Sequence, residues 1–187
     1  MGFRIVTQPT TEPVTVAEAK SHLRVDGSDD DTMIEAMITA AREECEHLLE
    51  RALAPQTVQL LLDEFVDEIP LPMPPLRSIV SVEYAAEDGT TGVVSSDDYT
   101  TDVGLEPPWL LQAGDAEWPD ADEVANAVSI TYEVGYSAEE IPKAIKHWIL
   151  LRVGTLYAYR EADSDKVPMP AMFADRMIDR YRVIRPY

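Results

Sequence analysis

The 187-residue sequence has a single cysteine, Cys45, and only three histidines, His22, His47 and His147. One thiol cannot form an intrachain disulfide, so a packed core must stabilise the fold, and a chain of this length can bury one. Apolar runs are short as well, and Trp148–Leu151 is far below the ~20 residues that a membrane-spanning helix needs. With no apolar segment of the signal-peptide kind near the N-terminus, the sequence predicts a cytosolic protein without a membrane segment.

Basic residues are also scarce: 15 Lys and Arg stand against 35 Asp and Glu, for a formal net charge of −20. No Lys or Arg lies between Arg77 and Lys143, although this region holds 15 acidic residues. Such a region repels DNA phosphates and lacks the clustered cations that groove binding requires. Two interpretations stay open: a solvated surface that keeps the protein soluble, and a surface past which DNA slides without adhering.

No pattern typical of a catalytic, cofactor or metal site is present. Cys45 and His47 lie two apart on a predicted helix and so face different directions, which disfavours a cysteine hydrolase. The acidic run at residues 26–31 does not have the spacing of a calcium-binding loop. Asp30 and Asp31 are instead expected to cap the helix that follows. No glycine-rich phosphate loop occurs, and we expect a protein that is not an enzyme and binds no cofactor.

Helical and strand patterns alternate along the chain. Thr15 and Glu18 form a capping box for a short helix, and a long amphipathic helix then runs to about Arg51. Short β-branched runs follow, with a hairpin turn at Asp88–Gly89 and a proline-rich segment, residues 69–78, that belongs at a sheet edge or in a linker. Helical spacing returns at Ser137.

These patterns predict an α+β fold that is mainly α, with about four helices and a small antiparallel β-sheet between the second and the third helix. The expected divisions are residues 1–56 for the N-terminal helices and 57–136 for the inserted β region. Residues 137–162 would form the central bundle helix, and 163–187 the C-terminal helix and tail.

The order of several segments carries a further signal. The segments are PVTVAEAKSHLRVD, DDTMIEAMITAAREECEHLLERALAPQT, LPMPPLRSIVSVEYAAEDG, DDYTTD, WPD, VSITYEVGY and IPKAIKHWILLRVGTLYAYREA. Their order and spacing, from Pro13 to about Ala162, resemble the head-tail connector, or adaptor, proteins of long-tailed bacteriophages and phage-like particles.

The resemblance implies a helical bundle with an inserted small antiparallel β-sheet. It also implies a structural virion protein at the head-tail junction, made in the host cytoplasm and without enzymatic activity. It implies a homo-oligomeric ring of roughly a dozen subunits around one axis, closed by head-to-tail contacts. The implied partners are the portal protein and a tail-side stopper or tail terminator protein, with DNA passing through the channel without specific binding. The alternative is an acidic DNA-mimic inhibitor of a DNA-processing enzyme.

Two sets of residues are candidates for contact with partners. The chain ends in a basic and aromatic segment, and its members, which we expect to bind the portal, are Arg176, Arg180, Tyr181, Arg182, Arg185 and Tyr187. Pairing of these arginines with the protein's own carboxylates is the alternative. Trp109 and Trp118 lie in the irregular part of the β region and are candidate interface anchors, or else part of a small satellite core.

Overall fold

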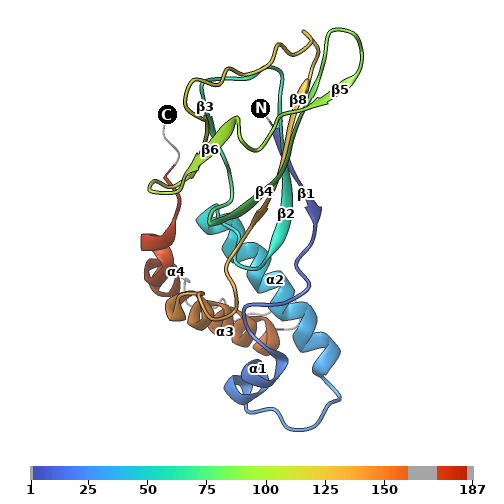
Figure 1. The fold of residues 1–187 in the computed structure, drawn as a ribbon. Helices are drawn as coiled ribbons and strands as arrows, with labels where there is room; N and C mark the ends of the chain where they lie inside the picture. Colours follow the sequence, from blue (N-terminus) through green and yellow to red (C-terminus); the bar gives the residue numbers. More distant parts are fainter. Residues whose placement is uncertain (1, 160–171, 185–187) are drawn as a thin grey trace. The chain divides into compact units, whose positions relative to one another are not determined.

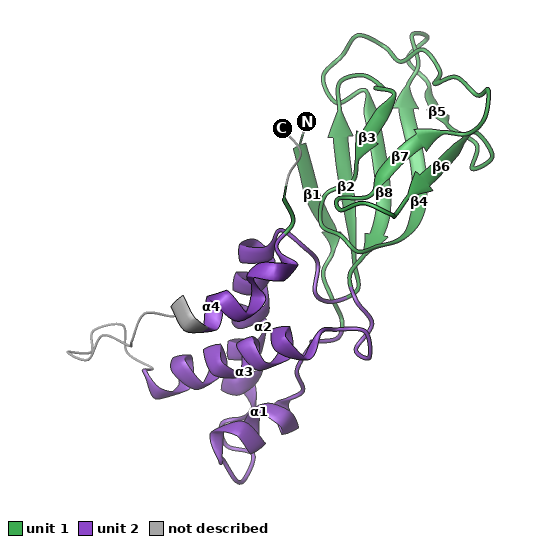
Figure 2. Cartoon of the chain, turned by 90° about the vertical axis from the view of Figure 1, so that its left-hand side faces the viewer, with its two compact units in different colours: residues 1–10, 55–135, 183–187 green, residues 11–54, 136–182 purple. Residues whose placement is uncertain are grey.

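The computed structural model describes residues 2–159 and 172–184, and the chain folds into two compact units. Unit 1 contains residues 1–10, 55–135 and 183–187, and unit 2 contains residues 11–54 and 136–182 (Figure 2). The chain therefore passes between the two units four times.

Unit 2 is built from helices (Figure 1). They are α1 (Val16–Leu23), α2 (Asp31–Leu49), α3 (Lys143–Ala158) and α4 (Met172–Ile178), which continues into a 3₁₀ turn, η1 (Asp179–Tyr181). Apolar residues at helical spacing on α2 and α3 form its core, since each helix buries one stripe against the other. The core members are Val14, Ala19, Ile34, Ile38, Ala41, Cys45, Leu49, Leu53, Ile141, Ile145, Trp148, Ile149, Val153 and Ile178.

The start of α1 confirms the predicted capping box. The Glu18 backbone N–H donates to Thr15 Oγ1 at 3.1 Å, and the Thr15 N–H donates to Glu18 Oε2 at 2.8 Å. The start of α2 differs from the prediction, because the Asp30 side chain makes no capping hydrogen bond. It accepts a hydrogen bond from the Tyr157 hydroxyl at 2.5 Å instead, and so ties α2 to the end of α3.

Unit 1 consists of two antiparallel sheets. The five-stranded sheet has the order β1 (Gly2–Thr7), β2 (Gln56–Leu62), β8 (Val128–Val134), β4 (Leu76–Ala85) and β5 (Thr91–Val93). The three-stranded sheet has the order β3 (Glu68–Pro70), β7 (Trp109–Gln112) and β6 (Tyr99–Asp102). Figure 2 shows the smaller sheet lying over one face of the larger one.

Alternation along the strands separates the core of unit 1 from solvent. In β2, every second residue from Gln56 to Leu62 is buried, and β8 follows the same pattern. Apart from Gln56, the inward positions are apolar and buried, as expected for a sheet covered on one face. They include Val58, Leu60, Ile130 and Tyr132 on the larger sheet and Ile69 and Leu110 on the smaller one.

The hairpin turn and the edge strand that local sequence signals predicted are both present in this unit. The hairpin between β4 and β5 turns at Asp88–Gly89, where Gly89 has φ +80° and the Asp88 carboxylate accepts hydrogen bonds from Thr90. The proline-rich segment contributes β3, which is an edge strand, as its missing N–H donors require.

The prediction of a mainly α fold is wrong. Among residues 2–159 and 172–184, strand accounts for 26% and helix for 30%, and the strands form two sheets with a core of their own. The predicted single inserted sheet left out β1, because residues 2–7 were assigned to the helical part of the chain. It also placed the runs at β6 and β7 in that one sheet, because strand runs alone do not show which strands pair, whereas the structure joins them with β3 in a second sheet.

Two buried arginines hold unit 2 at the points where the chain enters and leaves it. Arg42 is 3% exposed; its Nε donates to Glu12 Oε2 at 2.9 Å and its Nη1 to Glu46 Oε2 at 2.7 Å. The other oxygen of Glu46 accepts the Leu53 N–H at 2.8 Å. Arg51 is 3% exposed as well, and it donates to the Tyr181 carbonyl at 2.6 Å and to the Tyr136 hydroxyl.

Replacing Arg42 tests this arrangement, because Arg42→Met leaves the buried Glu46 carboxylate without its cation. We expect the free energy of unfolding to fall by about 3–5 kcal/mol, the cost of breaking one side of a buried pair. Urea unfolding followed by circular dichroism measures it. The matched control is Glu43→Gln, since Glu43 lies 3.4 Å from the same guanidinium but is 57% exposed. The control should change stability by about 0–1 kcal/mol, and equal losses in the two variants would contradict the argument.

Candidate interaction surfaces

The predicted portal-binding residues lie on α4, η1 and the residues that follow. Arg176 and Arg180 are exposed on this helical segment, four positions apart as expected, and the Arg180 guanidinium carbon lies 5.1 Å from the centre of the Tyr181 ring. Neither arginine forms an ion pair with any described carboxylate. Arg185 and Tyr187 lie outside the described residues.

This segment is anchored to the body of unit 2. Ile178 is 1% exposed and belongs to the helical core, and Asp175 Oδ1 accepts a hydrogen bond from Trp148 Nε1 at 3.0 Å. Arg182 Nε donates to the Leu48 carbonyl at 2.9 Å and thereby satisfies one of the free carbonyls in the last turn of α2. Of the predicted set, Arg176 and Arg180 therefore face solvent, whereas Tyr181 and Arg182 also fix the segment in place.

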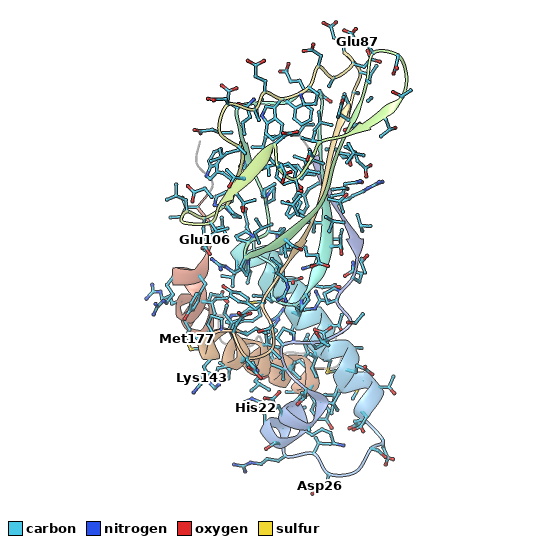
Figure 3. All side chains as sticks on the ribbon, in the orientation of Figure 1. His22, Asp26, Glu87, Glu106, Lys143 and Met177 are labelled. Carbon is cyan, nitrogen blue, oxygen red and sulfur yellow. The ribbon has the colours of Figure 1, made fainter. Side chains whose placement is uncertain are left out.

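A second surface is the acidic end of unit 1, defined here as the loops 63–67, 86–90, 94–98 and 113–127. Strand pairing brings these loops to the same end of both sheets, because β8 begins opposite the ends of β2 and β4, and β6 begins opposite the end of β7. The loops contain 12 Asp and Glu and no Lys or Arg. Figure 3 shows their carboxylate oxygens around Glu87.

Charge is divided unevenly between the units. Unit 1 contains 17 Asp and Glu against three Lys and Arg, whereas unit 2 contains 18 against 12. The acidic region predicted from the sequence is therefore concentrated at one end of the β unit. At the other end of the same sheet, β2 begins and β8 ends, and there the chain connects to unit 2.

The two tryptophans have different environments. Trp118 stacks on Phe65 with the ring centres 4.9 Å apart and the planes at 7°, and Phe65 meets Tyr84 edge to face. This packing fits the satellite-core alternative, and it holds the loop 113–127 against unit 1. Trp109 begins β7, where it pairs with Pro70 and Asp102 and is partly exposed. A role of either ring at an interface stays a prediction.

The residues considered for cysteine chemistry do not come together. Cys45 is fully buried, whereas His47 is exposed, as their spacing on one helix predicted. Burial raises the pKa of the Cys45 thiol far above its ordinary value, and the nearby Glu46 and Glu44 raise it further. His22 and His147 do approach each other, with ring centres 6.5 Å apart, across α1 and α3. Among the described residues, no three His, Cys, Asp or Glu side chains are placed to hold a metal ion.

One surface was not found from the sequence. All six residues of β1 are exposed, and they include the apolar side chains Phe3, Ile5 and Val6. The alternation of Phe3 and Ile5 with Arg4 was the available signal. It is short, and the partner strand β2 lies more than 50 residues away in the sequence, so no hairpin pattern accompanies it. Within the described part of the chain, no helix is both long and apolar enough to cross a membrane.

The chain is a two-unit α+β protein, and the candidate functional features described above are exposed surfaces suited to contact with other molecules. Residues 13–97 match the model of the phage gp6-like head-tail connector family. This match confirms the resemblance to head-tail connector proteins that the order of the sequence segments predicted. No curated protein matches the chain.

Solved structures match along the whole chain. A chain from the neck of an empty gene transfer agent (GTA) particle, computed with C6 symmetry, has a TM-score of 0.80 and 22% identity, covering 100% of this chain and 98% of that one. A chain from the virion of the native GTA particle has a TM-score of 0.77 and 22% identity with the same coverage. A chain from the native GTA neck, computed with C12 symmetry, has a TM-score of 0.77, 21% identity and the same coverage. These chains share the fold of this protein, including both units.

The environment of Cys45 leads to a prediction about its reactivity. We expect iodoacetamide at neutral pH to leave the native protein unmodified, because the reactive species is the thiolate and burial suppresses it. Mass spectrometry measures the modification, and the same protein unfolded in urea is the control that should react completely. Rapid stoichiometric labelling of the native protein would support the cysteine hydrolase alternative instead.

Proposed function

We propose that this chain is a structural head-tail connector that forms a ring at the neck of a phage-like particle and lets DNA pass. The observation that carries the proposal is the family match over residues 13–97 together with a fold shared along the full chain with neck proteins. Solved necks computed with C6 and C12 symmetry support a ring. Nothing in these comparisons supports the DNA-mimic alternative, and the proposed role requires no catalysis.

In this proposal the portal contacts the surface formed by Arg176, Arg180, Tyr181 and Arg182. Arg176 and Arg180 have no intramolecular ion pair among the described residues, so their donors are available for carboxylates or backbone carbonyls of a partner. The anchoring of Ile178 and Arg182 orients these side chains before binding, which reduces the entropy lost on association. A tail-side stopper or tail terminator protein would bind the ring at a different surface from the portal.

The acidic end of unit 1 is proposed to border the DNA channel. Its loops contain no described cation that could pair with a phosphate, and so DNA passing nearby would be repelled and would not adhere. The stacked Trp118 and Phe65 rings keep the longest of these loops folded against the sheet, so the carboxylates stay in fixed positions.

Charge reversal on α4 tests the portal surface. Deleting residues 176–187 is unsuitable, because it removes the buried Ile178. We expect Arg176→Glu/Arg180→Glu to weaken co-sedimentation with portal at least about tenfold, since losing one partner of a desolvated charge pair costs about 2–5 kcal/mol. The thermal midpoint should change little because both side chains are exposed.

The matched control for this variant is Arg24→Glu/Lys143→Glu. It makes the same change in net charge at two exposed positions elsewhere in unit 2. This control should bind portal as the wild type does. Normal binding by the α4 variant, or equal loss in both variants, would contradict a portal contact at this surface.

The acidity of unit 1 also predicts how assembly depends on salt. Copies arranged around a channel bring many like charges together, and this repulsion acts over a Debye length of ~8 Å at physiological salt and ~3 Å at 1 M. We therefore expect the ring fraction, measured by light scattering at fixed protein concentration, to rise as sodium chloride is added. Sucrose at matched osmolarity is the control because it does not screen charge, and a ring fraction that falls with salt would exclude an acidic channel wall.

A further inference from the structure

The inner apolar face of the five-stranded sheet continues beyond the part that is buried. Phe3 pairs with Leu60 and Ile5 with Val58, so these two side chains extend the row of inward-facing core residues onto β1. Leu60 and Val58 are fully buried, yet Phe3 is 43% and Ile5 39% exposed. Val6, at the bulge in this pairing, is 53% exposed. The uncovered apolar surface thus lies at the β1 edge of the five-stranded sheet.

The outer edge of β1 is also unprotected. β1 is the last strand of its sheet, so the backbone groups on its outer side have no strand partner among the described residues. Natural proteins shield such edges with charges, prolines or a covering segment. β1 contains one charged residue, Arg4, and no proline. A six-residue edge strand with three exposed apolar side chains and this little protection is the kind of edge that other proteins cover.

A complementary surface lies at the other side of the same unit. The connection between β6 and β7 carries Val103 and Leu105, which are 66% and 63% exposed, between the acidic residues Asp102 and Glu106. Asp102 accepts the Gly104 N–H at 2.8 Å, which holds this tip in a defined turn. β1 and β6 lie on opposite sides of unit 1 in both views, and Figure 3 places Glu106 away from β1 (Figures 1–3).

We propose that the β6–β7 tip of one copy packs on β1 of the next copy in the ring. Val103 and Leu105 would cover Phe3 and Ile5, while Asp102 would approach Arg4, one of only two described basic residues in this unit. A head-to-tail ring requires two different, mutually complementary surfaces on each copy. The apolar match and the opposite charges on opposite sides of one rigid unit meet that requirement. This inference rests on the proposed ring.

Polar substitutions at the tip test the contact without disturbing the fold. We expect Val103→Ser/Leu105→Ser to raise the protein concentration needed for ring formation on portal at least about tenfold. The reason is that Phe3 and Ile5 of the neighbouring copy then stay exposed to water. The control is Val124→Ser, which changes another exposed apolar residue of unit 1, itself 46% exposed. Thermal midpoints of all variants should match that of the wild type.

A cysteine pair locates the contact directly. Ile5→Cys/Leu105→Cys should give a ladder of disulfide-linked oligomers when assembled rings are mildly oxidised, whereas either single variant should stay monomeric on a non-reducing gel. Cys45 does not interfere because it is buried. In addition, a maleimide should label Ile5→Cys more slowly in rings than in free subunits.

The outcomes separate this contact from the ring itself. Rings that form normally from Val103→Ser/Leu105→Ser, or rings in which the cysteine pair does not cross-link and Ile5→Cys stays fully accessible, would overturn the proposed contact while leaving the connector function intact. If the wild-type protein forms no ring even with portal, the proposed function fails first.

Discussion

Two buried arginines, Arg42 and Arg51, set the constraint on which the helical unit depends. The chain enters or leaves unit 2 at four places, and each is held by one of these guanidinium groups or its carboxylate partner. Arg42 binds Glu12 and orients Glu46, which accepts the Leu53 N–H; Arg51 binds Tyr136 and the Tyr181 carbonyl. Arginine suits this position because its planar group donates several hydrogen bonds in fixed directions while staying charged. Four separate segments are thereby fixed at the surface of one small helical core.

The same arrangement allows the two units to carry different surfaces. With its ends held by internal hydrogen bonds, unit 2 can expose cations on α4 without using them for stability. Unit 1 has a separate apolar core between its sheets, so the charged side chains of the loops at its acidic end can all be carboxylates. A division of charge on this scale in one chain of 187 residues would be costly within a single small core, because repulsion among the carboxylates would act on the same packing contacts.

Local signals in the sequence predicted local structure well. The Thr15–Glu18 capping box, the Asp88–Gly89 hairpin and the edge position of the proline-rich segment depend on residues within a few positions of one another, and all three were found. The order of segments also predicted the resemblance to head-tail connector proteins that the family match over residues 13–97 confirms. What the sequence did not predict depends on contacts between distant residues. β1 pairs with a strand that begins at residue 56, and short strands such as β6 and β7 form a sheet only together.

The candidate surfaces likewise divide into features that local sequence predicts and features that depend on contacts between distant residues. Helical spacing placed Arg176 and Arg180 together on an exposed face, but it gave no sign that Arg182 and Tyr181 hydrogen-bond to α2 and to the residue just beyond its end. Sequence composition located the acidic region, but only strand register shows that its loops meet at one end of unit 1. The exposure of Phe3 and Ile5 could not be predicted from the sequence, because apolar residues that alternate along a strand are normally buried on one face of a sheet.

Repulsion between acidic units and a small apolar contact together explain how a ring would assemble only where it is needed. A contact formed by a few side chains is too small to hold two strongly negative subunits together in dilute solution, since stable interfaces bury about 1,200–2,000 Å². In the proposed arrangement, a subunit bound to the portal through α4 would present its β1 to a neighbour's tip at an effective concentration in the millimolar range. Each closed contact then adds to the portal contact without a further loss of translational freedom. A weak, repeated interface of the proposed kind would therefore favour free monomers in solution and a complete ring on the portal.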